Sequence, residues 1–372
     1  MSAMIAIWAL FGLRLSRTNA PLLMILLLFI VGGIVSMSQL AELKDAPLYI
    51  GVALFLAMTA VFYAAIIEQD MTLLPVIYSA YIYAALFTSV LGFAGYFHLF
   101  PGADYFTLYD RARGGFKDPN VFGPFLMLPV AWLLYGVLRG KVAMIPLRLL
   151  GLLIISLGAF LSFSRAAWGL EVMVLLLVSV FSFMSSDSNR IRLRIIALAG
   201  AVFVIVALAL IIALQFPAIS DLFADRAKLV QSYDGARLGR FARYALGLQV
   251  AIEHPLGIGP LIFPTLFGED THNIWLKAAL DYSWLGFVAY VLLTVMTLGI
   301  GAKILMRDRP WQPFLICAYS VYIGHVIIAN IISTDHWRHF YLLVGIIWGC
   351  YGLEHRYNLL RKKPATAVVG NF

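Results

Sequence analysis

The sequence is poor in charge. Only 12% of its 372 residues are Asp, Glu, Lys or Arg, whereas an ordinary soluble domain has about 25%. It has two cysteines, both within apolar runs, which is typical of packing residues and not of a disulfide framework. It contains no Asp-x-Asp sugar-nucleotide motif, no P-loop and no dinucleotide fingerprint. These features exclude soluble, disordered, collagen-like and disulfide-stapled proteins.

What the chain has in abundance is apolar sequence. Apolar residues make up 62% of it, and the mean hydropathy is +0.90. Many long apolar runs in one chain predict a polytopic all-α membrane protein, because a helix satisfies its own backbone in lipid. A transmembrane barrel would show alternating strands instead. The net charge of +8 is explained by basic residues that orient helices, so we expect no nucleic-acid partner.

Charged residues divide the chain into ten expected membrane spans in a single integral membrane domain over residues 1–372. A helix needs roughly 20 residues to cross the hydrocarbon core. Seven runs without charge have this length: 18–41, 46–67, 71–103, 119–138, 195–220, 282–302 and 310–334. Three more spans are shorter or interrupted: 145–163, 166–184 and 336–351.

Orientation follows from the Lys and Arg residues of the short connections. With ten spans the two termini share a side, and that side holds the larger share of these basic residues. We therefore expect both termini to be cytoplasmic. The longest segment on the opposite side, residues 215–282, contains aromatic residues, prolines and a helix pattern. It predicts a large folded periplasmic loop, and an ordered loop of this length is usually functional.

Arginines in this loop form the first candidate site. Residues 234–253 show an amphipathic helix pattern, in which Arg237 and Arg240 stand about one turn apart beside the apolar face, followed by Arg243. One interpretation is a helix on the membrane surface whose arginines reach lipid headgroups. The other is an anion site, because guanidinium groups suit phosphate oxygens.

A tight outer turn, residues 162–168, contributes Arg165. By itself this pattern favours an interfacial Arg–Trp anchor. Glu171 lies deeper in the following helix, where a carboxylate is costly and therefore a functional candidate. Six residues separate the two along the chain, about 240° around a helix, so they do not share a face.

The end of the large loop places His272 and Asn273 after two acidic residues, just before a span. A histidine there is suited to remove a proton from an acceptor hydroxyl near neutral pH. A solvated loop histidine is an equally good interpretation of this segment alone.

Weaker signals lie elsewhere. Asp118-Pro119 predicts a helix start, and Lys117 before it is placed to touch phosphate. The glycines of residues 257–260 predict a turn, with an anion site as the alternative. Asp335, His336 and His339 are only weak evidence for a metal.

Taken together, these motifs resemble the O-antigen ligase and polymerase superfamily over residues 114–286. The resemblance rests on their order, side and spacing: Phe116-Lys117-Asp118-Pro119-Asn120-Val121-Phe122-Gly123, Ser164-Arg165-Ala166-Ala167-Trp168, Gly239-Arg240, Glu253-His254-Pro255-Leu256-Gly257-Ile258-Gly259, His272-Asn273 and Leu285-Gly286. It implies a GT-C-like helical fold. Family members often have about twelve spans, whereas ten are expected here.

The resemblance also implies an activity. Members move a glycan from an undecaprenyl-diphosphate carrier to an acceptor on the outer face of the bacterial inner membrane, without a nucleotide sugar, cofactor or metal. The acceptor would be lipid A–core or another glycan repeat, and membrane lipid would surround the site. By motif, Arg165 and Arg240 would grip the diphosphate, and His272 would be the general base. Substrate binding would involve Arg237, Lys117, Asn273 and Glu171.

Three other interpretations remain open. A peptidoglycan polymerase of the shape–elongation–division–sporulation family would rely on an acidic residue of the large loop, such as Glu253 or Asp270. A transporter or flippase predicts broken helices in paired halves, and the sequence shows no such symmetry. A non-catalytic scaffold has no need of an ordered loop that carries arginines.

Overall fold

The computed structural model describes residues 8, 12, 15–226 and 239–362 of the chain. In this part of the chain, regular structure is almost entirely helical, and the only strands form a two-residue hairpin, β1 (Thr107–Leu108) with β2 (Arg111–Ala112). The structure confirms the expected all-α polytopic class.

The helices follow the expected spans closely. The first half of the chain forms α2 (Ala20–Met37), α3 (Ala46–Gln69), α4 (Leu73–Tyr96), η2 (Ala103–Phe106), α5 (Pro119–Phe125), α6 (Met127–Arg139), η3 (Val142–Met144), α7 (Ile145–Leu161) and α8 (Arg165–Met184). The second half forms α9 (Asn189–Ala213), α10 (Pro217–Arg226), α11 (Arg240–Glu253), α12 (Ile262–Phe267), α13 (Ile274–Leu305), α14 (Gln312–Ile328) and α15 (Arg338–Lys362).

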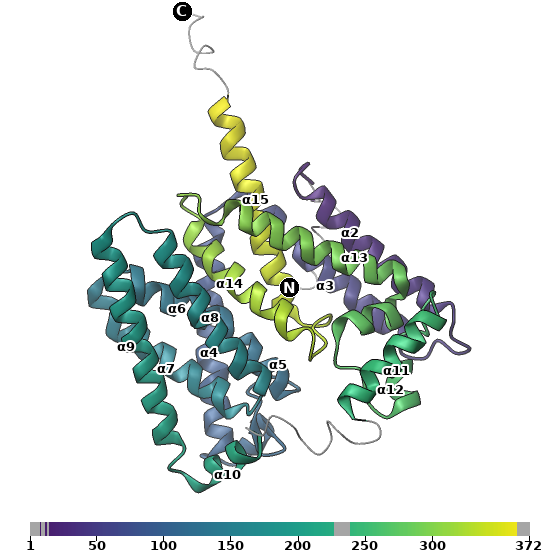
Figure 1. Cartoon of the computed structure of the whole chain (residues 1–372), viewed down its shortest axis with the longest axis horizontal. Coiled ribbons are helices and arrows are strands. Elements are labelled where there is room, and N and C mark those ends of the chain that lie inside the picture. Colours follow the sequence, from purple (N-terminus) through teal and green to yellow (C-terminus); the bar gives the residue numbers. More distant parts are fainter. Residues whose placement is uncertain (1–7, 9–11, 13–14, 227–238, 363–372) are drawn as a thin grey trace, which may run out of the picture.

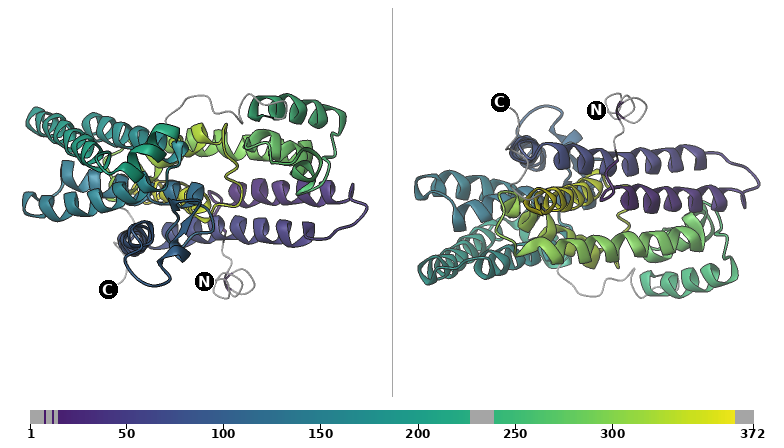
Figure 2. Two further views of the ribbon diagram at one scale, coloured as in Figure 1. Left: turned by 90° about the horizontal axis from the view of Figure 1, so that it is seen from below. Right: turned by 90° about the horizontal axis from the view of Figure 1, so that it is seen from above.

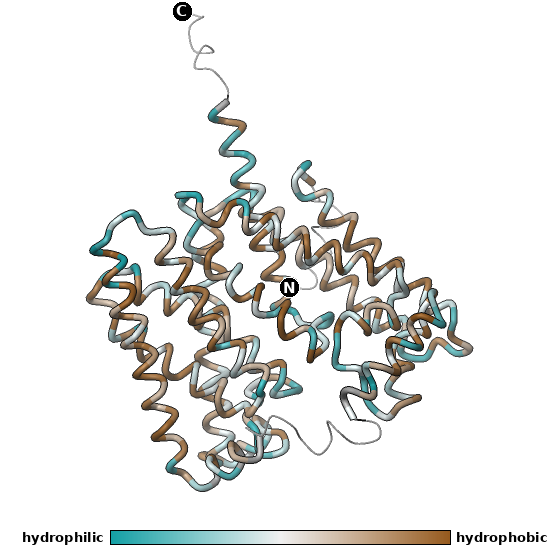
Figure 3. Tube along the Cα trace, viewed as in Figure 1, coloured by the Kyte–Doolittle hydropathy of each residue, from teal (hydrophilic) through white to brown (hydrophobic). Residues whose placement is uncertain are grey.

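Eight helices in the described residues are long and apolar enough to cross a membrane. Of the other two expected spans, the first corresponds to α14, which is apolar but has only 17 residues. The second corresponds to α15, whose last turns carry charge. Figure 3 shows apolar residues along most of the helices and polar residues at many of the turns that join them.

The helices form two bundles, which Figures 1 and 2 show beside each other. In the first, α2 packs along α13 and α3 packs along α15. The second contains α4 to α9, and α14 contacts α6 and α8 of this bundle as well as α13 and α15 of the first. The interface between α3 and α15 uses glycine: a Cβ at Gly345 would lie 2.8 Å from the Ala60 carbonyl oxygen. Small residues of this kind let membrane helices approach closely.

One boundary differs from the expectation. The span expected to begin at Tyr282 begins at Ile274, so the large loop ends at Asn273. The additional turns carry Lys277 and Asp281, and both side chains are buried against other parts of the chain. Their charges ended the apolar run in the sequence, but tertiary ion pairing allows the helix to continue through them.

Candidate active site

The site is centred on the short segment that precedes α13. His272 is half-buried and adopts a left-handed backbone conformation, with φ +50°. Such a conformation is uncommon for a residue with a side chain and persists where the surrounding structure enforces it. Asn273 caps α13: its Oδ1 accepts from the backbone N–H groups of Trp275 and Leu276, at 3.0 and 3.2 Å. His272 is thus held immediately before a fixed helix start.

The end of α14 holds this segment from the other side. The Asn330 carbonyl oxygen accepts hydrogen bonds from Asn273 Nδ2, at 3.1 Å, and from the Tyr244 hydroxyl, at 2.9 Å. The Asn330 side-chain oxygen accepts from the indole N–H of Trp275, at 3.1 Å. Three helices, α11, α13 and α14, therefore converge beside His272.

Both acidic residues before His272 are paired with cations. Glu269 Oε2 lies 2.5 Å from Nη1 of Arg243, a buried residue of α11. Asp270 Oδ2 lies 2.7 Å from Nζ of Lys277, on the first turn of α13. These carboxylates neutralise buried cations, and the two ion pairs tie the segment to both helices.

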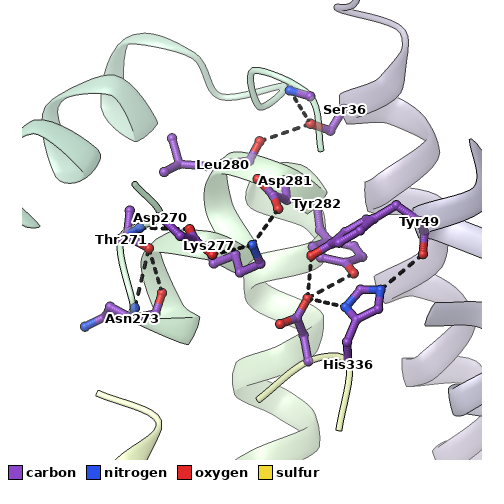
Figure 4. Close-up of polar contacts among 12 residues, drawn as sticks. Ser36, Tyr49, Asp270, Thr271, Asn273, Lys277, Leu280, Asp281, Tyr282 and His336 are labelled. Atoms are coloured by element: carbon purple, nitrogen blue, oxygen red, sulfur yellow. Dashed lines mark hydrogen bonds and ion pairs between the residues drawn. The ribbon is translucent and has the colours of Figure 1, made fainter. Parts of the chain in front are cut away.

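Lys277 links the site to a larger buried polar cluster, shown in Figure 4. Its Nζ also lies 3.2 Å from Asp281 Oδ2, one turn further along α13. A buried charge is tolerated when it is paired and hydrogen-bonded. The hydroxyls of Tyr49 and Tyr282 then donate to Asp335 Oδ2, at 2.7 and 3.3 Å. The cluster therefore joins α3, α13 and the connection between α14 and α15.

His336 completes this cluster as a cation. Its Nδ1 lies 2.8 Å from Asp335 Oδ2, and its Nε2 lies 3.2 Å from the Tyr49 carbonyl oxygen. Both neighbours are acceptors, so both ring nitrogens are best satisfied when protonated. Burial opposes the charge, but the Asp335 carboxylate and the two hydrogen bonds raise the pKa of His336 above its ordinary value. Burial likewise opposes ionisation of Asp335, but His336 and Lys277 lower the pKa of that carboxyl.

This pair predicts a pH dependence of stability. Because the folded-state pKa of His336 is raised from 6.5, its stabilisation is complete below that pH and is lost as the pH rises through the folded value. The stabilisation from Asp335 is present above pH 3.8 and lost only in stronger acid. We expect the thermal stability of the purified protein to fall as the pH is raised above 6.5.

Measurement of melting temperatures from pH 6 to 9 tests this expectation. His336→Gln should remove the pH-dependent component, whereas His355→Gln, at an exposed position of α15, should retain it. An unchanged pH profile in His336→Gln would contradict the assignment of the effect to this pair.

A break in α13 frees backbone groups that hydrogen-bond to residues 255–258 of the large loop. Ser283 has non-helical backbone angles, φ 62° and ψ 174°. The break leaves the Leu280 carbonyl oxygen to accept from the Ile258 N–H, at 3.0 Å, and from the Ser36 hydroxyl, at 3.1 Å. The Trp284 N–H donates to the Pro255 carbonyl oxygen instead, at 3.1 Å. Residues 253–260 therefore form a turn that is hydrogen-bonded to α2 and α13. The Ile258 N–H donates to the Leu280 carbonyl oxygen and the Gly259 N–H donates to Ser36 Oγ, so both amides are used within the protein.

Glycine is required in this turn for two reasons. Gly257 has φ +82°, and a Cβ there would lie 2.3 Å from Ser36 Oγ and 2.7 Å from the Leu280 carbonyl oxygen. Gly259 has φ +98°. A side chain at either position would strain the backbone and push the turn off α13.

The α11 helix buries one face in the protein and exposes its apolar face. Arg243, Gly247 and Ala251, spaced by four, are buried. Leu248 and Ile252, on the expected apolar face, are exposed by 52% and 63%. This apolar face therefore does not pack on the described protein, as expected of a helix that lies against lipid. Arg237 and the side chain of Arg240 lie outside the described residues, so their predicted role stays a prediction.

Arg165 is the first residue of α8, in the second bundle. Ser164 caps this helix by accepting from the Ala167 N–H, at 3.4 Å. Buried Arg111 fixes the turn: its guanidinium donates to the Ser162 carbonyl oxygen, at 2.8 Å, and to Asn120 Oδ1, at 2.9 Å. The order of the helices places the starts of α8 and α13 on the same side of the membrane. The structure therefore puts Arg165 and His272 on one face but in different bundles.

Lys117 and Glu171 lie in two different cavities. Lys117 is exposed and lines a cavity beside the start of α15. Glu171 is buried in a mostly apolar cavity of about 190 Å³ among α7, α8 and α9, together with Ser156. The structure does not bring Glu171 to His272. In the described residues, no group of three or more His, Cys, Asp or Glu is arranged to hold a metal ion.

The fold is that of a polytopic α-helical membrane protein, in which the candidate residues Arg165 and His272 lie at or just before helix starts on one face. Residues 150–291 match the family described as O-antigen ligase. This match supports the resemblance of the chain to the O-antigen ligase superfamily, whose proteins are membrane glycosyltransferases. No curated protein matches the chain. The motif around Lys117 lies before the matched segment.

Proposed function

We propose that this protein is an inverting glycosyltransferase that moves a glycan from an undecaprenyl-diphosphate carrier to an acceptor at the periplasmic face of the bacterial inner membrane. The observation that carries the proposal is the pattern of ion pairs in residues 269–273, directly before α13. Glu269 and Asp270 are both engaged by buried cations, while His272 stands between them and the capped helix. The backbone of His272 is held in a left-handed conformation directly before the Asn273 cap, and this fixed position makes it our choice for the group that takes the proton.

The proposed reaction is a one-step displacement. The acceptor hydroxyl gives its proton to His272, and its oxygen attacks the anomeric carbon of the donor glycan. The bond between that carbon and the diphosphate oxygen breaks, and the diphosphate leaves with the electron pair. Attack opposite the leaving group inverts the anomeric configuration. Arg165 and Arg240 stabilise the departing charge, so the proposal requires no metal and no other cofactor.

The remaining predicted residues have different support. Lys117 lines a cavity with other cationic groups, which favours a role toward phosphate. Both ends of the Asn273 amide are used within the protein, so we assign Asn273 the task of fixing the position of His272. Glu171 faces its own cavity, and its predicted substrate contact has no support from this placement. Arg237 keeps its prediction from the sequence.

The nearest alternative is the acid-dependent peptidoglycan-type polymerase. For one of its two candidate carboxylates, Asp270, the ion pair with buried Lys277 weighs against it, because that carboxylate is already engaged. Glu253, exposed at the end of α11, accepts a hydrogen bond from Gln249 Nε2 at 2.9 Å, and Glu253→Gln tests the alternative there. Ligase and polymerase differ in the acceptor, which is lipid A–core or another repeat. Lipopolysaccharide profiles of a deletion strain separate them: unattached long chains indicate a ligase, and single-repeat caps indicate a polymerase.

The arginines provide the test of diphosphate recognition. Arg165→Ala and Arg240→Ala should each reduce transfer from a lipid-linked donor, by about 2–5 kcal/mol in transition-state free energy if the contact is a buried charge pair. Lysine should not restore activity, because a bidentate contact requires the guanidinium fork. The measurement is the transfer rate of the purified, folded variants.

Arg190→Ala is the matched control. Arg190 is exposed in the first turn of α9, at the end of the bundle opposite to Arg165, and its replacement should leave the transfer rate at the wild-type value. If Arg165→Ala and Arg240→Ala also retain it, these arginines are membrane anchors and the proposed diphosphate contact is wrong.

A further inference from the structure

The cavity that Lys117 lines lies between the two bundles, and its other walls come from α3, α4, α5 and the start of α15. Its volume is about 680 Å³, within the range of small-molecule sites. Three of its lining residues carry positive charge, and none is acidic. These three are Lys117, His336 and Arg338.

The charges in this cavity are of two kinds. Lys117 and Arg338 are exposed, and neither forms an ion pair within the described residues. His336 brings an imidazolium, whose charge is shared with Asp335 behind it. The cavity therefore presents two cations that the described protein leaves without counter-ions. A ligand with negative charge is the natural complement.

His339 adds a hydrogen-bonding group at the inner end. It is 5% exposed, and its Nε2 has no hydrogen-bond partner among the described residues. Buried polar atoms are normally satisfied, so an orphaned nitrogen on a cavity wall indicates a ligand or water. Arg338 is also the first residue of α15, so the positive end of a 25-residue helix faces the same region.

The rest of the lining is largely apolar. Phe55, Leu56 and Tyr63 of α3 line one wall, which extends eight residues along this helix, or about 12 Å. Leu342 of α15 and Phe125 of α5 form other walls. Since α3 is one of the membrane-spanning helices, this wall reaches from the cationic end toward the bilayer interior. The cavity suits a molecule that is anionic at one end and apolar along its length.

We propose that this cavity binds the phosphate group of a lipid, with Lys117 and Arg338 on the phosphate oxygens and the hydrocarbon chain along α3. The phosphate would come from the polyprenyl carrier or from a bilayer phospholipid. In the first case the inference rests on the proposed function and assigns the carrier a contact outside Arg165 and Arg240. In the second it stands alone.

Binding is measured directly, by native mass spectrometry of the purified protein with three lipids. Undecaprenyl phosphate, phosphatidylglycerol and uncharged undecaprenol are the probes. The double variant Lys117→Gln/Arg338→Gln should bind undecaprenyl phosphate at least about tenfold more weakly, which corresponds to about 1.4 kcal/mol. Undecaprenol binding should not change. The matched control is Lys141→Gln/Arg361→Gln, which removes the same charge at exposed positions and should bind like the wild type.

A second variant tests the cavity itself. Leu342→Trp fills the space without removing a charge, and it should weaken phosphate-lipid binding while the protein folds normally. Loss of binding in both variants for undecaprenyl phosphate alone identifies the carrier as the source. Loss for phosphatidylglycerol as well identifies a general phospholipid site. Unchanged binding of both phosphates, or an equal loss for undecaprenol, would overturn the inference.

Activity keeps this result separate from the proposed reaction. His272→Ala should lose transfer but bind undecaprenyl phosphate like the wild type, because the cavity is intact. If no transfer is detected with any donor, the binding comparison of the two double variants still decides the inference.

Discussion

His272→Ala is expected to lower the rate of glycan transfer by about 10²–10⁴-fold, the usual effect of removing a positioned general base. The residue is half-buried, has a left-handed backbone conformation and directly precedes the Asn273 cap of α13. The arginines remain in this variant, so binding of the lipid-linked donor should be retained. The measurements are single-turnover transfer and donor affinity with purified protein.

His254→Ala is the control for this experiment. His254 is exposed and lies at the end of α11, where its backbone N–H donates to the Val250 carbonyl oxygen. Its replacement should change stability more than rate. Intact activity in His272→Ala, with loss of activity in Asp270→Asn alone, would transfer the role to the carboxylate and favour the peptidoglycan-type polymerase.

Lys277→Met should be the most destabilising of the substitutions considered. The ammonium group is buried and pairs with Asp270, at 2.7 Å, and with Asp281, at 3.2 Å. Methionine keeps the size of the side chain but leaves the buried Asp281 carboxylate without its cation. Removing one partner of a buried pair costs about 3–5 kcal/mol. With about 2–4 °C per kcal/mol, the melting temperature should fall by roughly 6–20 °C.

Lys303→Met is the matched control, because it makes the same change at an exposed position in the last turn of α13. It should leave the melting temperature nearly unchanged. Lys277→Arg retains the charge and should recover part of the loss, limited by the space around a larger head group. A melting temperature of Lys277→Met equal to that of the control would show that the buried pairs contribute nothing to stability.

The same lysine connects the two proposed sites. Asp270 lies two residues before His272, and Lys277 belongs to the cluster that continues through Tyr49 and Asp335 to His336. His336 is on the wall of the cationic cavity. Disturbing Lys277 should therefore affect the position of His272 as well as stability.

The sequence by itself determined the class of protein and the ends of most helices. Long apolar runs can satisfy their backbone in lipid only as helices, so hydropathy alone located the eight helices that are long and apolar enough to cross a membrane, although α13 begins earlier than expected. Local capping chemistry also predicted the start of α5: the Asp118 side chain accepts from the Asn120 N–H, as expected from Asp118-Pro119. Such signals depend on residues close together in the chain, and these can be read without the fold.

The tertiary structure alone decided which charges are partners. Tyr49 and Asp335 are 286 residues apart, yet they share a 2.7 Å hydrogen bond. From the sequence, Lys277 ends an apolar run and is expected in the loop, because nothing nearby in the chain shows that two carboxylates enclose it. Lys117 and Arg338 likewise meet around one cavity only because α5 and α15 are brought together. Pairing across such distances depends on helix packing, and no local spacing encodes it.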